Sequence, residues 1–473
     1  MGRDKGEVAK KPKLKEAISY PVYDATKLGK TRMVVLGAQH LFAMFGATVL
    51  VPALTGLSVS ATLFFAGIGT LIFHLISKRK VPAFLGSSFA FLAGYMAIAP
   101  GRERELLPYA CFGVACAGII YLILAVLFMI FEHEGVMSFL PPVVTGPIII
   151  AIGLSLSQSA VDYCSENWAI AIIAILIIIM CSLYGRGMLK IVPIIMGVVG
   201  SLFIASVMAI LVGGNNDNFV LFNPEKIQAI KDAAWIGLPI DFQDTVFSIF
   251  KDPDYKLLVS SVLTITPIAL ATIVEHIGDI SAISSTVGED FINDPGLHRT
   301  LTGDGIATTV ASLFGAPANT TYGENTGVLS LSRVYDPKVI EIAAVFSIVL
   351  SFSPKVAACI FAIPTSIIGG ISLVLYGMIS AVGIRNIVEN KVDFSKSRNV
   401  IIAAIILVLA VGIKYSAEGA INIYLGNMAV SLSGLAVGSI VGIILNAILP
   451  GRDYKLGEHV EDVNKKPNKK AWD

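Results

Sequence analysis

The chain has 473 residues, of which 55% are hydrophobic and only 15% are charged, and its mean hydropathy is +0.76. This balance excludes an ordinary soluble protein. The net charge of +1 indicates no particular partner, and no nucleic-acid partner is expected. Windows of about 20 apolar residues, the length that crosses a bilayer as a helix, recur along the chain. We therefore expect an all-α polytopic membrane protein.

The N-terminus and the cysteines indicate which further features the chain is expected to lack. The first residues are charged and the chain stays polar until about Val34, so no cleavable signal peptide is expected. The five cysteines are odd in number, lie mostly in apolar runs and form no CxxC or Cys/His cluster. They favour neither a disulfide framework nor a metal site, and no cofactor is expected.

The apolar windows divide the chain into two sets of seven predicted spans. The first set is 34–54, 58–77, 82–98, 107–131, 142–160, 167–184 and 190–212, and the second is 257–284, 300–315, 318–332, 337–353, 355–383, 399–415 and 428–449. The remaining parts are an N-terminal tail (1–33), a polar connection (213–256) and a C-terminal tail (450–473), so the two repeats are 34–212 and 257–449.

The two halves resemble each other in detail. Pro141 and Gly146 in LPPVVTGPIII have the same spacing as Pro364 and Gly369 in IPTSIIGGISL. Each half also has a broken third span, which makes predicted spans 3 and 10 an extended piece followed by a half-helix. Matched broken spans in two halves are typical of transporters whose site lies between internal repeats, and an odd number of spans per half makes the repeats inverted.

Lys and Arg support this topology. With the N-terminus inside, most of these residues fall in cytoplasmic segments, chiefly the N-terminal tail, 78–80, 385–398 and 465–470. The positive-inside rule is thereby satisfied. We expect both termini to be cytoplasmic and the 213–256 connection to be extracellular.

The stretch APANTTYGENTGVLSLSR (316–333) is the strongest pointer to a site. It places polar residues between apolar runs, and irregular polar backbone survives at membrane depth only inside protein or beside a water-filled cavity. The half-helix that begins near Gly323 offers free N–H groups and a positive dipole end to a polar ligand. The alternative interpretation is an ordinary loop outside the membrane.

Ionisable residues inside spans are costly and hence functional candidates. Four carboxylates qualify: Glu275, Asp279, Asp304 and Glu324. Glu275 and Asp279 are four residues apart and share one helix face, which is expected to face the cavity. Like charges one turn apart favour protonation of one of the two, so a proton-coupling site is possible. Structural neutralisation is the alternative, and Asp304, between two glycines, could instead cap a helix start.

Other polar and aromatic residues are weaker candidates. His276 lies about a quarter-turn from the acidic face and could bond a neighbouring helix, and His40 in the first span is either a coupling group or a packed core residue. Ser88 and Phe89 lie where the third span breaks, beside free backbone N–H groups, so the Phe89 ring could stack on a flat ligand. Tyr322 and Asn325 flank the second break.

Two other classes of function fit less well. The chain contains no HExxH, GxSxG or GxxxxGK[ST] pattern, so no enzyme is expected. A channel is harder to exclude, but channels favour rings of like residues from several subunits, whereas this chain has matched halves and one acidic site.

Several stretches resemble the nucleobase-ascorbate transporters, and within them the bacterial uracil permeases. The family signature resembles [Q/E/P]-N-x-G, four residues, then T-[R/K/G]; here it is Glu324-Asn325-Thr326-Gly327, Val328–Leu331 and Ser332-Arg333, with serine in place of threonine. Further similar stretches are GAQHLFAMFGATVLVP (37–52), VPAFLGSSFAF (81–91), ATIVEHIG (271–278) and TGDGIATTVASLFG (302–315).

The resemblance implies fourteen spans in two inverted repeats of seven, with a core domain (spans 1–4 and 8–11) and a gate domain (spans 5–7 and 12–14). It implies that Glu275 and Glu324 bind the nucleobase, with backbone contacts at Phe89 and Gly323, in a bacterial inner-membrane protein, and a homodimer through the gate domain. Glutamate at position 324 resembles the uracil branch, whereas aspartate at 279 resembles purine-type members.

Uracil fits such a site physically, because its two N–H groups suit carboxylates and its two carbonyls suit backbone donors. The resulting hypothesis is a secondary transporter that imports uracil by proton symport. Proton-coupling candidates are Glu275, Asp279, His276, Asp304 and His40. The alternatives are a xanthine- or urate-type purine permease and an anion exchanger of similar architecture.

Overall fold

The computed structural model describes residues 21–130, 141–186, 189, 192–212, 224–425 and 428–451. The first half contains α2 (Lys30–Thr55), α3 (Val59–Ile76), β1 (Leu85–Ser87), α4 (Leu92–Ile98), α5 (Leu107–Ile130), α7 (Pro142–Ser165), α8 (Trp168–Tyr184) and α10 (Pro193–Val212). The short 3₁₀ helix η1 (Ala25–Leu28) precedes them. The predicted tails fall mostly outside the described residues.

The second half repeats this order after a connection that holds α11 (Pro224–Asp232) and the 3₁₀ helices η3 (Phe242–Asp244) and η4 (Val246–Lys251). It contains α12 (Tyr255–Ile265), η5 (Thr266–Ile268), α13 (Ala269–Val287), η6 (Ile292–Gly296), α14 (Leu297–Leu313), β2 (Asn319–Thr321), α15 (Gly323–Ser332), α16 (Pro337–Ser351), α17 (Pro354–Phe361), α18 (Thr365–Glu389), α19 (Ser397–Lys414), β3 (Ala420–Leu425), β4 (Met428–Ser433) and α20 (Gly434–Ile448).

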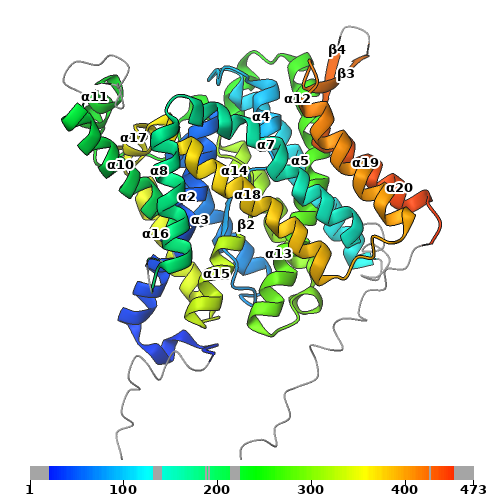
Figure 1. Cartoon of the computed structure of the whole chain (residues 1–473), viewed down its shortest axis with the longest axis horizontal. Coiled ribbons are helices and arrows are strands. Elements are labelled where there is room, and N and C mark those ends of the chain that lie inside the picture. The colour runs from blue at the N-terminus through cyan, green and yellow to red at the C-terminus, as the bar shows by residue number, and fades with distance from the viewer. Residues whose placement is uncertain are drawn as a thin grey trace, which may run out of the picture.

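The helices pack as two bodies. In the core domain α5 packs along α14, and α3 packs along α16 and α14; in the gate domain α7 packs along α18 and α19, and α8 along α10 and α18. Figure 1 shows α11 and the β3–β4 hairpin at one end of the molecule, called here the outer end, and the first described residues at the opposite, inner end.

Each of these helix contacts has a counterpart between the equivalent helices of the other half. The contact of α5 with α14 corresponds to that of α16 with α3, and the contact of α12 with α5 corresponds to that of α2 with α16. In the gate domain the α8–α10 pair corresponds to α19–α20. This correspondence is what two inverted repeats require.

Prolines and glycines at matching positions in the two halves determine how α7 and α18 begin and how closely they pack. Pro141 and Pro364 are the N-cap residues of α7 and α18, as their shared spacing indicates. A Cβ on Gly146 would lie 2.3 Å from Ile387 of α18, and one on Gly369 would lie 2.6 Å from the Cys164 nitrogen of α7. These glycines let the two helices approach closely.

Two predicted spans are wrong in detail. The segment 355–383 is not one helix, because α17 ends at Phe361 and α18 begins only after Pro364. A residue that precedes a proline disfavours the helical conformation, which explains the break before Pro364. At its other end, α17 is bent by 87° relative to α16. The segment 428–449 begins as strand β4, paired antiparallel with β3, and becomes helical only at Gly434.

The number of spans stays a prediction. Among the described residues, seven helices are long and apolar enough to cross a membrane, or eight if the bent pair α16–α17 is one span. Shorter apolar helices, α8, α10 and α20, accompany them, and the two broken spans combine a strand with a half-helix.

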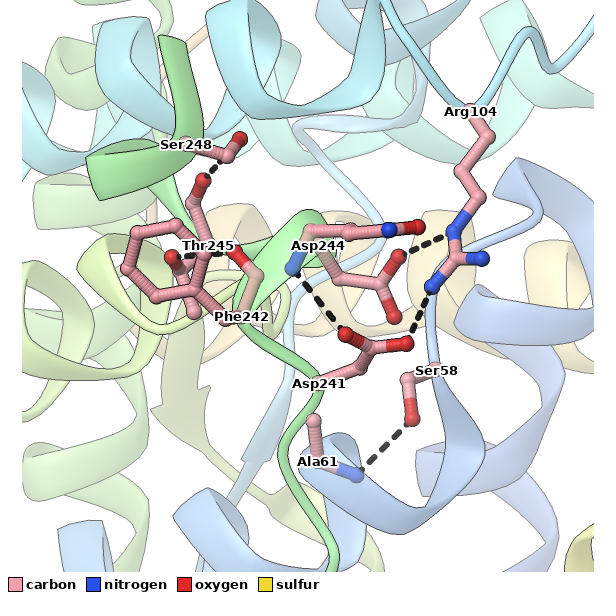
Figure 2. Close-up of polar contacts among 9 residues, drawn as sticks. Ser58, Ala61, Arg104, Asp241, Phe242, Asp244, Thr245 and Ser248 are labelled. Atoms are coloured by element: carbon pink, nitrogen blue, oxygen red, sulfur yellow. Dashed lines mark hydrogen bonds and ion pairs between the residues drawn. The ribbon is translucent and has the colours of Figure 1, made fainter. Parts of the chain in front are cut away.

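The polar connection is held on the core domain at the outer end. Arg104, in the loop before α5, donates from Nε to Asp244 Oδ1 and from Nη2 to Asp241 Oδ2, both at 2.6 Å (Figure 2). Ile240 packs against an apolar cluster formed by residues of α3 and α14, among them Ala61 and Ala311. The backbone N–H of Gln243 and the Arg104 guanidinium hold the pKa of Asp241 below its usual range, and the two carboxylates raise the pKa of Arg104.

We expect Arg104→Gln to loosen this connection. The pair is half exposed, so the effect on global stability is small and the effect on local opening is the useful readout. Hydrogen exchange of residues 241–251, corrected for intrinsic rates, should accelerate in the variant. The exposed Lys256→Gln is the matched control, and equal exchange in both variants contradicts the assignment.

The same contact predicts a pH dependence. Because the pKa of Asp241 is lowered in the folded state, its contribution is complete above the unfolded value of about 4 and is lost as pH falls through the folded value. Protection of residues 241–251 should therefore be constant from about pH 5 to 8 and decline below about pH 4. A decline on raising the pH would contradict this sign.

The α7–α18 contact predicts opposite effects for two glycine substitutions. A Cβ on Gly153 would lie 2.2 Å from the Tyr376 carbonyl oxygen, whereas one on Gly377 of α18 meets nothing within 4 Å. Gly153→Ala should lower the melting temperature in detergent, and Gly377→Ala should leave it unchanged or raise it slightly, since alanine favours helix by about 0.5–1 kcal/mol over glycine. Equal melting temperatures would contradict the close approach.

Candidate functional site

The two broken spans meet at the centre of the core domain. Strands β1 and β2 pair antiparallel with Leu85 opposite Thr321 and Ser87 opposite Asn319. The Ser88 N–H donates to the Ala318 carbonyl at 2.8 Å, and the Tyr322 N–H donates to the Phe84 carbonyl at 3.0 Å. Each non-helical segment thus supplies hydrogen bonds that the other needs in a membrane interior.

Tyr322 fixes this crossing rather than projecting into open space. Its hydroxyl donates to the Ser87 carbonyl at 2.9 Å, and the Thr48 hydroxyl donates to it at 3.4 Å. A Cβ on Gly86 would lie 2.4 Å from the Tyr322 ring, so glycine is required there. The side chain of Tyr322 therefore holds β1 against β2 from inside the core domain.

Helix α15 begins immediately after β2 with an open face. Gly323 and Gly327 are both exposed, and a Cβ on Gly327 would meet no described atom within 4 Å. Tyr322, the N-cap residue of α15, makes no side-chain cap hydrogen bond to the first turn. The first turn of α15, at the positive end of the helix dipole, therefore carries an exposed glycine face.

The acidic pair of α13 lies beside this helix start. The Thr321 hydroxyl donates to Asp279 Oδ2 at 2.8 Å, and Asp279 Oδ1 lies 3.8 Å from the position of a Cβ on Gly323. Asp279 is buried and Glu275 is half-buried, one turn away on the same helix. A carboxylate next to the N-terminus of α15 is electrostatically favourable.

His276 and Asp304 form a separate, sealed pair. His276 Nδ1 lies 2.8 Å from Asp304 Oδ2, and both side chains are completely buried between α13 and α14. Asp304 is in the interior of α14, so the expectation that it caps a helix start is wrong. Gly303 and Gly305 on either side let Phe73 and Tyr121 pack against this helix, since Cβ atoms would lie 3.0 and 2.7 Å from them.

His40 and Asn325 lie behind α15, away from its open glycines. Asn325 Nδ2 is 3.2 Å from His40 Nδ1 and donates to the His40 carbonyl at 3.3 Å. Both side chains are buried, and this contact joins α2 to the second position after Gly323. The pair ties the half-helix to the core domain.

Ser88 and Phe89 lie at the first break. The Ser88 hydroxyl is buried without a described hydrogen-bond partner. The Phe89 ring packs edge-to-face on Tyr376 of α18, with centroids 5.9 Å apart, so it touches the gate domain. The Glu324 side chain lies outside the described residues, and its backbone is the second residue of α15.

Two residues of this region escaped sequence reasoning. Thr321 bonds Asp279, and Tyr376 forms the gate side of the Phe89 contact. Thr321 lies within the polar stretch 316–333, which the sequence analysis identified as part of a site. Its hydrogen bond to Asp279 was not predicted. Tyr376 gave no signal, because a tyrosine in an apolar span is typical of ordinary packing.

Comparisons with known proteins agree on the family. A family model described as "Permease family", of the xanthine and uracil permease type, matches residues 31–419. The chain is 39% identical over 434 residues to the uracil permease of Bacillus caldolyticus, covering 89% of this chain and 92% of the relative. It is 36% identical over 427 residues to the uracil permease of Escherichia coli K12, covering 88% and 90%.

Solved structures support the fold. The transmembrane domain of the cyanobacterial bicarbonate transporter BicA matches with a TM-score of 0.55 and 14% identity, covering 91% of this chain and 100% of that domain. The murine anion transporter Slc26a9, in its inward-facing state, matches with a TM-score of 0.57 and 11% identity, covering 88% and 67%.

Inverted halves, paired central strands and two packed bodies thus agree with the sequence matches over most of the chain. The chain belongs to the nucleobase-ascorbate transporter family.

Proposed function

We propose that this protein imports uracil by proton symport, with substrate bound between the core and gate domains. The observation that carries the proposal is the open start of α15 beside the acidic face of α13. The permeases of B. caldolyticus and E. coli, named for uracil, support the choice of substrate.

Uracil presents two N–H donors and two carbonyl acceptors on a flat, neutral ring. Glu275 supplies a carboxylate from α13 and Glu324 a second from the first turn of α15. The N–H groups at the start of α15 supply donors for the carbonyls. This combination also disfavours an anionic substrate, because the two carboxylates repel it.

The aromatic and glycine residues provide shape. Phe89 contacts Tyr376 across the domain boundary, so its ring is available to stack on a planar base as the two domains separate. Gly323 and Gly327 keep the α15 face flat. Ser88, Tyr322 and Asn325 support the site from within the core domain, where their polar groups fix both breaks.

Proton coupling is assigned to the acidic face of α13. Glu275 and Asp279 lie one turn apart, and Thr321 donates to Asp279 Oδ2, so this carboxylate already has a partner in the core domain. Glu275 then carries the transported proton, and binding of a neutral base next to it links protonation to uptake. The buried His276–Asp304 and His40–Asn325 contacts position α13 and α15.

Transport would then proceed by movement of the gate domain against the core domain. The strongest packing lies inside each domain, which suits rigid-body motion. We also propose insertion in the bacterial inner membrane with cytoplasmic termini, an extracellular connection at 213–256, and a homodimer through the gate domain.

A purine permease of the same family is the second candidate. Aspartate at position 279 is the specific feature in its favour, since it resembles the purine-type members. A competition panel of uracil, thymine, xanthine and urate against labelled uracil separates the two. Efficient competition by xanthine or urate would favour the purine substrate.

The coupling proposal predicts that uracil uptake follows a pH gradient. Proteoliposomes with an acidic exterior should accumulate labelled uracil, and a protonophore should abolish accumulation. Glu275→Gln should lose gradient-driven uptake, because glutamine cannot carry a proton, while the exposed Glu289→Gln serves as control. Uptake that ignores the protonophore, or follows sodium, contradicts proton symport.

The site proposal predicts that Glu324→Gln weakens uracil binding. Hydrogen bonds to charged groups contribute roughly 1.5–3 kcal/mol, so affinity should fall about ten- to hundredfold. Glutamine can turn its amide oxygen to the ligand, so the loss should be smaller than for alanine. Ligand-free thermal stability should stay near wild type, since removal of a membrane charge relieves a burial cost. Isothermal titration that finds wild-type affinity removes Glu324 from the site.

A further inference from the structure

An apolar cleft lies at the boundary between the core domain and the gate domain. It encloses about 130 Å³ between α2, α10 and α18, with α17 at its outer end. Every described residue that lines it is apolar or glycine, including Phe45, Val49, Ile195, Val198, Ile360 and Ile371.

The periodicity of two helices creates the cleft. Phe45, Val49 and Ala53 follow one another at four-residue intervals on α2, and Ile194 and Val198 do so on α10. The two helices touch at Gly46, where a Cβ would lie 2.4 Å from Ile194. The side chains around this contact point leave a slot instead of an interlocked interface.

The slot opens toward the lipid-facing surface. Val199 lines it and is 56% exposed, and Phe203, one turn further along α10, is 69% exposed. Exposed apolar side chains of this size on a membrane-spanning helix face hydrocarbon. Water does not occupy an apolar cavity stably, because it finds no polar partners there. Lipid chains are therefore the occupant that the surroundings supply.

A positive charge lies at the outer end of the slot. Arg102 directs Nη1 to the carbonyl of Ala53, a lining residue, at 3.5 Å. Its other terminal nitrogen hydrogen-bonds the Tyr163 hydroxyl of the gate helix α7, and its side chain remains exposed. A guanidinium here matches the phosphate of a phospholipid whose chain enters the slot from the outer leaflet.

We propose that this cleft binds one acyl chain of an outer-leaflet phospholipid, with its phosphate at Arg102. The chain fills the boundary between the two domains, which is the boundary that must change during transport. Bound lipid is thus a variable part of the core–gate interface. The proposal does not depend on the identity of the transported base.

Photo-crosslinking tests the site directly. Wild-type protein in nanodiscs that contain phosphatidylglycerol with a diazirine on its acyl chain is irradiated, and labelled peptides are mapped by mass spectrometry. We expect labels on the cleft faces of α2 and α10, around Phe45–Ala53 and Ile194–Val199. Labels spread evenly over all lipid-facing helices, or crosslinks between two protein copies at this face, overturn the proposal.

A filling variant and its control sharpen the result. Val198→Trp places a large ring in the slot, whereas Val207→Trp places it on the exposed face of the same helix. Cleft labelling should fall at least about fivefold in Val198→Trp and stay unchanged in Val207→Trp. Unchanged labelling in both contradicts occupancy of the slot. The wild-type label map decides the question even if the filled variant folds poorly.

The headgroup contact has its own test. Added phosphatidylglycerol should raise the melting temperature of detergent-purified wild type, because a ligand that binds only the folded state stabilises it. The rise should be smaller in Arg102→Gln, and diacylglycerol without phosphate should give a smaller rise in wild type. Equal rises in all three cases remove Arg102 from the lipid site.

Discussion

The fold depends on the pairing of two non-helical segments at its centre. Backbone N–H and carbonyl groups of β1 and β2 cannot be solvated by lipid, and each strand satisfies the other. Tyr322 seals the crossing by bonding the Ser87 carbonyl over Gly86. Because one strand comes from each half, neither repeat can form its broken span alone. The crossing also fixes where α15 starts, so the two broken spans place a helix start with an exposed glycine face next to Asp279 at membrane depth.

The two inverted repeats together form two densely packed domains, core and gate, with fewer helix contacts at the boundary between them. Within the gate domain α7 and α18 pack closely, as at Gly153 against the Tyr376 carbonyl, where glycine removes the side chain that would hold the helices apart. The boundary has one such contact at Gly46 against Ile194, and its other contacts differ in kind: Phe89 on Tyr376, Arg102 on Tyr163, and an apolar slot between α2 and α10. An edge-to-face ring contact and an exposed polar bond can be broken, and an apolar slot can change shape, without disturbing the packing inside either domain.

Sequence reasoning predicted what local chemistry determines. Prolines at 141 and 364 start matched helices, and polar residues in two apolar runs mark the breaks. It failed where tertiary contacts decide. The run 355–383 is mostly apolar, so hydropathy could not show that α17 ends at Phe361 and that α18 begins only after Pro364. The run 428–449 hides a strand, because alternating apolar residues in β4 contribute as much hydropathy as a helix does. Thr321 needed its partner Asp279 to be recognised, and that partner is 42 residues away in sequence.

Carboxylates within the membrane illustrate why burial cost alone does not assign function. Asp304 and Asp279 are equally improbable there by hydropathy, yet Asp304 is enclosed with His276 among Phe73 and the helices around it, without access to any open face. Asp279 keeps one oxygen on the Thr321 hydroxyl and the other toward Gly323, where α15 begins. An enclosed pair joins two helices, whereas Asp279 lies next to the first turn of a half-helix that carries an exposed glycine face. The two acids therefore differ in their surroundings, which the sequence shows only indirectly, and it is these surroundings, not the burial cost, that distinguish a candidate for binding from an enclosed pair.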